Sequence, residues 1–82
     1  MAKKAVKLVK LTFSQKLIKE PVIFTMAQKF DVMPNIRRAR VTDKIGEMVL
    51  ELAGEEKKLE KGIAYLIKVG VIVEPIVGDI IE

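Results

Sequence analysis

The residues whose types and spacing suggest chemistry lie close together in the middle of the chain. Asn35 is the only asparagine, and Arg37, Arg38 and Arg40 follow it within the same apparent strand. An asparagine amide supplies both a hydrogen-bond donor and an acceptor, and an amino acid or a similar small zwitterion would use both. Guanidinium groups can hold phosphates. This segment is therefore the predicted binding region of the chain.

Both features also have explanations that need no ligand. Asn35 follows Pro34 at the start of a strand, where an asparagine can satisfy a turn by bonding its own backbone. Arginines on an edge strand protect that strand from pairing with other chains. The sequence leaves both explanations open beside the functional one.

The composition argues against catalysis. The chain has no histidine and no cysteine, which removes the commonest general base, thiol chemistry, disulfides and cysteine-ligated zinc or iron–sulfur clusters. Ser14 is the only serine and has no histidine to activate it. The acids of residues 55–60 stand among lysines at helical spacing, as on a solvated face, and no phosphate-binding loop is evident. We predict a protein that is not an enzyme and has no metal site or cofactor.

Positive charge is concentrated in the first half of the chain. The net charge of the 82 residues is +4, and residues 1–44 hold 11 lysines and arginines but only 3 acids. A basic balance suggests an anionic ligand or nucleic acid, although small basic proteins of many kinds share it. RNA binding is the weakest alternative. The three phenylalanines and one tyrosine are expected in helices or under them, which leaves no ring to stack bases.

The hydrophobic pattern gives no sign of a membrane span or a leader. No apolar run approaches the ~18 residues that a span needs. The basic residues 1–4 are followed by lysines alternating with apolar residues, whereas a signal peptide needs an unbroken apolar stretch. We therefore expect a cytoplasmic protein.

Hydrophobic spacing predicts four strands and two helices. Strands are expected at residues 5–13, 33–41, 47–53 and 71–77. Helices are expected at residues 21–30 and 55–69. The buried stripe of the second helix is predicted to be Leu59, Ile63, Leu66 and Ile67. Gly62 in this helix should permit a close approach, and Gly70 should end it in a left-handed conformation.

The element order βαββαβ favours a ferredoxin-like α+β sandwich. Right-handed crossovers place the first and third strands in the centre of a four-stranded antiparallel sheet, with two helices on one face. Pro75 agrees, because a proline cannot donate to a ladder and belongs on an edge strand. On the second strand, alternation places Ile36, Arg38 and Arg40 on one face. We expect residues 1–82 to form this single domain.

Several short segments resemble the NIL domain in their order and spacing. They are Asn35 and Ile36 after Asp31 and Val32, Gly46, the strand at 50–54 and the segment 70–75. The NIL domain is named for an Asn-Ile-Leu tripeptide, and Arg37 stands where that tripeptide has leucine. The resemblance covers roughly residues 6–77.

The resemblance implies a regulatory domain. In that family the domain lies at the C-terminus of the ATP-binding subunit of methionine importers, where it binds methionine as a dimer and inhibits transport. Other members precede a bacterial-type ferredoxin module in proteins of sulfur assimilation, and residues 38–41 with the short turn to Gly46 look more like that group. The implied function is binding of methionine or a related sulfur compound. The alternative is docking of a ferredoxin or another redox or sulfur-assimilation partner without a free ligand.

Apolar residues on both faces of the first strand predict a homodimer. The helices cover only one face of the sheet, so the other would expose an apolar patch that monomers rarely tolerate. Pairing about a two-fold axis would bury this patch. We expect the ligand-binding site at or near the interface, close to Asn35, Ile36 and Arg38.

Overall fold

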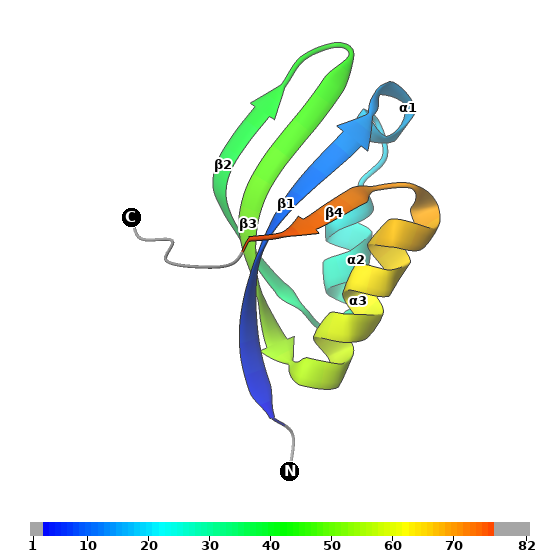
Figure 1. Cartoon of the computed structure of the whole chain (residues 1–82). Coiled ribbons are helices and arrows are strands. Elements are labelled where there is room, and N and C mark those ends of the chain that lie inside the picture. Colours follow the sequence, from blue (N-terminus) through cyan, green and yellow to red (C-terminus); the bar gives the residue numbers. More distant parts are fainter. Residues whose placement is uncertain (1–2, 77–82) are drawn as a thin grey trace.

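The chain forms a four-stranded antiparallel sheet with helices on one face (Figure 1). The computed structural model describes residues 3–76. The strands are β1 (Lys4–Ser14), β2 (Met33–Val41), β3 (Ile45–Glu55) and β4 (Ile72–Pro75), and the helices are α1 (Gln15–Ile18), α2 (Val22–Phe30) and α3 (Glu56–Val69). The strand order is β2-β3-β1-β4. The predicted ferredoxin-like α+β fold is confirmed, with β1 and β3 in the centre and Pro75 on an edge strand.

Some element boundaries differ from those expected. Residues 15–18 form the short helix α1, although neither a helix nor a strand is predicted there. Pro21 caps α2 rather than forming its first residue. The strand β4 ends at Pro75, and residue 77, at the end of the predicted strand, lies outside the described residues.

The core lies between the sheet and the helices. Its members come from the covered face of the sheet, the helices and the adjoining loops, and none is more than 6 % exposed. They are Val9, Leu11, Phe13, Val22, Met26, Val32, Leu50, Leu52, Leu59, Leu66 and Val71. This close-packed apolar layer joins the sheet to α2 and α3.

The helix α3 buries most of its predicted stripe. Leu59 and Leu66 are fully buried, and Ile63 packs against the margin of the core. Ile67 is 57 % exposed, so its predicted burial is wrong. The reason is geometric, because Ile67 lies about 100° around the helix from Leu66.

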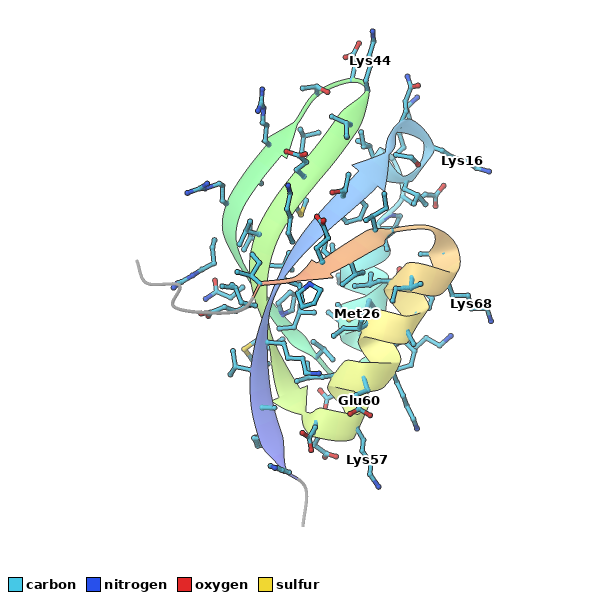
Figure 2. All side chains as sticks on the ribbon, in the orientation of Figure 1. Lys16, Met26, Lys44, Lys57, Glu60 and Lys68 are labelled. Carbon is cyan, nitrogen blue, oxygen red and sulfur yellow. The ribbon has the colours of Figure 1, made fainter. Side chains whose placement is uncertain are left out.

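Two glycines, one within α3 and one directly after it, have the roles predicted for them. A Cβ at Gly62 would lie 2.9 Å from Sδ of Met26, so α2 and α3 approach each other at a position that lacks a side chain. Met26 projects from α2 toward this contact (Figure 2). Gly70 ends α3 with a φ of 110°, and its N–H donates to the carbonyl of Ile67 at 3.1 Å.

A left-handed residue carries the chain from α2 toward β2. Asp31 has a φ of 57°, and the N–H of Val32 donates to the carbonyl of Ala27 at 3.1 Å. The carboxylate of Asp31 accepts a hydrogen bond from the ammonium of Lys58 at 3.3 Å. This bond, with the nearby charge of Glu55, raises the pKa of Lys58. These contacts tie the start of β2 to α3.

Candidate functional site

The edge strand β2 contains a β-bulge within the predicted binding region. Ile36 lies opposite Leu50 of β3, and Arg38 lies opposite the preceding residue of β3, Val49, which leaves Arg37 as the extra residue. Leu50 belongs to the core. Because directly opposed residues of antiparallel strands share a face, Ile36 lies on the helix-covered face and Arg38 on the open face. The prediction that Ile36 shares a face with the arginines at 38 and 40 is therefore wrong, since the extra residue interrupts the alternation.

The open face of the sheet consists of regular cross-strand rows. From β2 through β3 to β1 they are Met33/Ala53/Val6, Asn35/Glu51/Leu8, Arg38/Val49/Lys10 and Arg40/Glu47/Thr12. We call the first of these the apolar row. The later rows carry charge, and Lys10 and Glu47 form an ion pair at 4.0 Å. Among these four rows, the open face thus changes from apolar at the first to charged at the last.

Asn35, Arg37, Arg38 and Glu51 form a polar cluster on this face. Asn35 lies directly opposite Glu51, and Arg38 belongs to the next row. Nη2 of Arg37 lies 3.6 Å from Oε2 of Glu51, which places the side chain of the bulged residue on the open face as well. The structure therefore brings Asn35 and Arg38 together and leaves Ile36 on the other side of the strand.

Glu51 is the member of the polar cluster that the sequence prediction misses. Its alternation with Leu50 and Leu52 indicates a residue on the polar face of a strand. That pattern does not show which residue of β2 it meets. The pairing with Asn35 follows only from the register of β2 on β3.

The polar cluster offers partners for both ends of an α-amino acid. The carboxylate of Glu51 and the amide oxygen of Asn35 can accept hydrogen bonds from an ammonium group. The guanidinium groups and the amide nitrogen can donate to a carboxylate. The apolar row lies alongside, with Met33 71 % and Val6 64 % exposed. The arrangement suits binding of a small zwitterion with an apolar side chain.

The aromatic residues lie away from the open face. Phe13 is in the core, and Phe24 is exposed on α2. Phe30 and Tyr65, from α2 and α3, pack with ring centroids 5.7 Å apart. Over residues 3–76 the open face therefore carries no ring on which nucleic-acid bases could stack.

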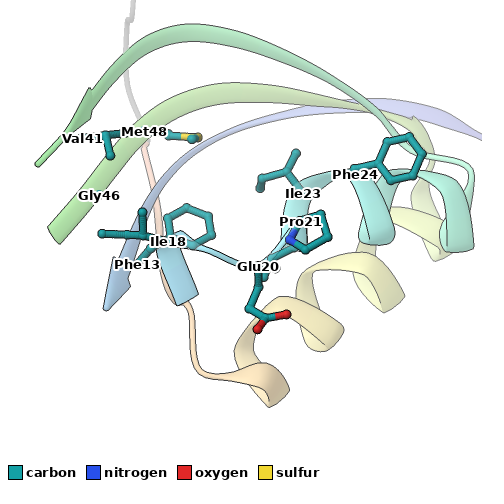
Figure 3. A pocket seen from close by; sticks show the side chains of 10 residues that line it. Phe13, Ile18, Glu20, Pro21, Ile23, Phe24, Val41, Gly46 and Met48 are labelled. Atoms are coloured by element: carbon teal, nitrogen blue, oxygen red, sulfur yellow. The ribbon is translucent and has the colours of Figure 1, made fainter. Parts of the chain in front are cut away.

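A separate apolar pocket of about 220 Å³ lies on the helix-covered side, where β2 ends and β3 begins. Its lining residues come from the sheet, from α1 and α2 and from the segment between these helices (Figure 3). They are Phe13, Ile18, Glu20, Pro21, Val22, Ile23, Phe24, Val41, Gly46 and Met48. The predicted site residues Asn35, Ile36 and Arg38 are not among them. The polar cluster and this pocket are therefore distinct surfaces.

Between residues 3 and 76, no three acidic side chains converge as ligands of a metal ion would. In the same range, no helix is long and apolar enough to cross a membrane.

The strand order and the helices on one face of the sheet define a ferredoxin-like domain of the α+β class. The family model of the NIL domain matches residues 7–75, and the chain belongs to this family. The resemblance drawn from the sequence is therefore confirmed.

Curated relatives are ATP-binding proteins of methionine import. The chain is 35 % identical over 74 residues to methionine import ATP-binding protein MetN 1 of Listeria innocua. It is 35 % identical over 71 residues to methionine import ATP-binding protein MetN of Coxiella burnetii. These matches cover 85 % and 82 % of this chain but only 22 % and 20 % of the relatives. The chain thus spans about a fifth of their length.

A solved structure supports the same relationship. The crystal structure of the C-terminal domain of an ABC transporter ATP-binding protein from Enterococcus faecalis is similar, with a TM-score of 0.76 and 27 % sequence identity. The match covers 89 % of this chain and 86 % of that one. The similarity is therefore to a C-terminal domain of such a protein.

Proposed function

We propose that this chain is a non-catalytic regulatory domain of the cytoplasm. Its proposed ligand is a small molecule, either methionine or a related sulfur compound. The observation that carries the proposal is the polar cluster beside the apolar row. Membership of the NIL family and the methionine import relatives support the choice of ligand.

The proposed ligand lies across the first rows of the open face. Its carboxylate receives hydrogen bonds from Arg38 and from the amide of Asn35, and its ammonium group donates to Glu51. Its thioether side chain lies on the apolar row. Ile36, whose side chain faces the helices, contributes its backbone and its position next to the bulge. The ammonium group of the ligand thus adds a second positive charge beside the carboxylate of Glu51, which is already paired with Arg37.

The proposed assembly is a homodimer formed through the open face. Val6, Met33 and Ile72 on this face are 64 %, 71 % and 59 % exposed. Two copies related by a two-fold axis bury these side chains against each other. The second copy then covers the polar cluster and excludes water from the ligand, which strengthens its charged contacts.

Calorimetric titration with methionine and a panel of other amino acids and sulfur metabolites tests the proposed function. We expect saturable binding of methionine or of one of the sulfur compounds. Asn35→Ala should abolish it, whereas Gln28→Ala, which removes an exposed amide on α2, should not. Equal affinity in both variants would contradict the site.

The alternative of a docking module without a free ligand predicts a different result. A thermal-shift panel would then show no stabilisation by any small molecule, whereas a true ligand at 100 times its dissociation constant adds about 2.7 kcal/mol. A shift with a purified ferredoxin or sulfur-assimilation protein, and with none of the compounds, would favour this alternative.

A further inference from the structure

The outer edge of β2 carries backbone groups that the sheet does not use. The N–H of Thr42 donates to the carbonyl of Ile45 at 2.9 Å at the end of the β2–β3 ladder. Hydrogen-bonded and non-hydrogen-bonded pairs alternate in an antiparallel ladder. The pairs that Val41 and Ala39 make with β3 are therefore non-hydrogen-bonded. Their N–H and carbonyl groups point away from β3, beyond the edge of the sheet.

The side chains along this edge differ in chemistry on the two faces. Ala39 and Val41 lie on the helix-covered side, and Val41 lines the apolar pocket together with Phe24. Arg38 and Arg40 lie on the open side, and both are exposed. Within the described residues, neither arginine has a carboxylate within 4.0 Å.

We propose that this edge of β2, from Arg38 to Val41, binds an extended segment of another protein in which acidic and apolar residues alternate. The segment adds a strand to the sheet by hydrogen bonding to the outward groups of Ala39 and Val41. Side chains alternate across a strand. Its apolar residues therefore enter the pocket, and its acidic residues lie beside Arg38 and Arg40.

Charge complementarity selects this occupant over a second copy of the chain. β2 contains three arginines and no acid. If two copies of β2 paired antiparallel about Ala39, Arg38 of one copy would face Arg40 of the other. Like charges directly opposed across strands are destabilising. A nucleic acid strand would satisfy the arginines but would use neither the outward backbone groups nor the apolar pocket.

This docking edge is separate from the proposed amino-acid site. Asn35 and its partner Glu51 lie near the start of β2, whereas Val41 is its last residue. Only Arg38 belongs to both surfaces. The tests therefore change Ala39 and Arg40, which are not part of the polar cluster. Loss of peptide binding and loss of amino-acid binding can then be told apart.

Two labelled synthetic peptides provide the first test, measured by fluorescence anisotropy. One alternates glutamate with valine, and the other has the same composition with the two residue types in separate blocks. The alternating peptide should bind saturably and at least about tenfold more tightly than the block peptide. Only the alternating peptide, added as a strand, places its valines toward the pocket and its glutamates toward the arginines. Equal binding of the two would show simple charge attraction and overturn the proposal.

A charge reversal provides the second test. Arg40→Glu should weaken binding of the alternating glutamate peptide at least about tenfold, because a glutamate of the peptide then lies beside a carboxylate. Lys68→Glu makes the same charge change on α3, away from this edge (Figure 2), and should leave the affinity unchanged. Equal effects of the two variants would overturn the proposal.

Hydrogen exchange measured by NMR provides a test that needs no variant. The amides of Ala39 and Val41 should exchange rapidly in the free protein and become protected by the alternating glutamate peptide. Ala39→Pro, which removes one outward N–H and no β2–β3 ladder bond, should abolish peptide binding. Unchanged exchange at both amides would overturn the proposal. Protection that rises with protein concentration alone would instead assign the edge to a second copy, and competition by single-stranded RNA would assign it to nucleic acid.

Discussion

Leu50 and Leu52 of β3 are fully buried under the helices, whereas Val49 and Glu51 of the same strand are only half-buried on the open face. The covered face is apolar and close-packed, so its side chains are held by their neighbours on every side. The open face mixes charged and apolar rows whose side chains are exposed or half-buried. A substitution on the covered face should therefore cost stability, and one on the open face should cost binding or assembly.

The largest change in the free energy of unfolding should come from truncating a core side chain, and the neighbouring exposed side chain serves as its control. Leu66 is fully buried and Ile67 is 57 % exposed on the same helix. We expect Leu66→Ala to lower the free energy of unfolding by about 2–5 kcal/mol. Ile67→Ala should change it by less than about 0.5 kcal/mol. Urea unfolding followed by circular dichroism measures both, and similar losses would contradict the difference between the two positions.

On the open face, a charge at Val6 should break the assembly and spare the fold. Val6 is 64 % exposed in the single chain, so Val6→Glu should change the unfolding free energy of the monomer by less than about 0.5 kcal/mol. In the proposed dimer it introduces a carboxylate into each copy of an apolar interface. Light scattering at micromolar concentration should show a dimer for the natural chain and a monomer for the variant.

The matched control for this assembly test is Ile67→Glu. Ile67 is similarly exposed but belongs to α3, on the covered side of the sheet. This variant should remain dimeric. A monomeric natural chain would refute the dimer, and a dimer that survives Val6→Glu would place the interface on another surface.

Much of the covered face follows from the sequence, and much of the open face does not. Period-two and helical spacing identify the strands and helices, because burial imposes those periods on apolar residues. Gly70 and Pro75 are recognisable because each meets a specific backbone requirement. The bulge at Arg37 has no such marker, since it arises from how β2 aligns with β3. The faces of Ile36 and Arg38 and the role of Glu51 depend on that alignment.

Deleting Arg37 tests whether the bulge positions the polar cluster. Arg37 is the extra residue, so its deletion leaves Ile36 and Arg38 on their present faces and shortens the path between Asn35 and Arg38. The half-exposed ion pair with Glu51 is lost, which should cost about 1 kcal/mol or less. Methionine affinity, measured by calorimetry, should fall more for the deletion than for Arg37→Ala, which keeps the bulge. Equal losses would mean that the bulge does not position the site.

The smallest change in stability should come from breaking the ion pair of Asp31 and Lys58, which lies on neither face of the sheet. The hydrogen bond from Lys58 to Asp31 raises the folded-state pKa of Lys58 above its ordinary value of 10.5. A raised pKa means that the pair contributes fully to stability below pH 10.5 and loses its contribution as the pH rises through the folded-state pKa. Asp31→Asn keeps a residue type that tolerates the left-handed conformation and removes the charge. The stability difference between the natural chain and this variant, measured by urea unfolding, should therefore be constant near neutral pH and shrink in strong alkali. A difference that stayed the same across the alkaline range would show that Asp31 acts through the backbone turn rather than through Lys58.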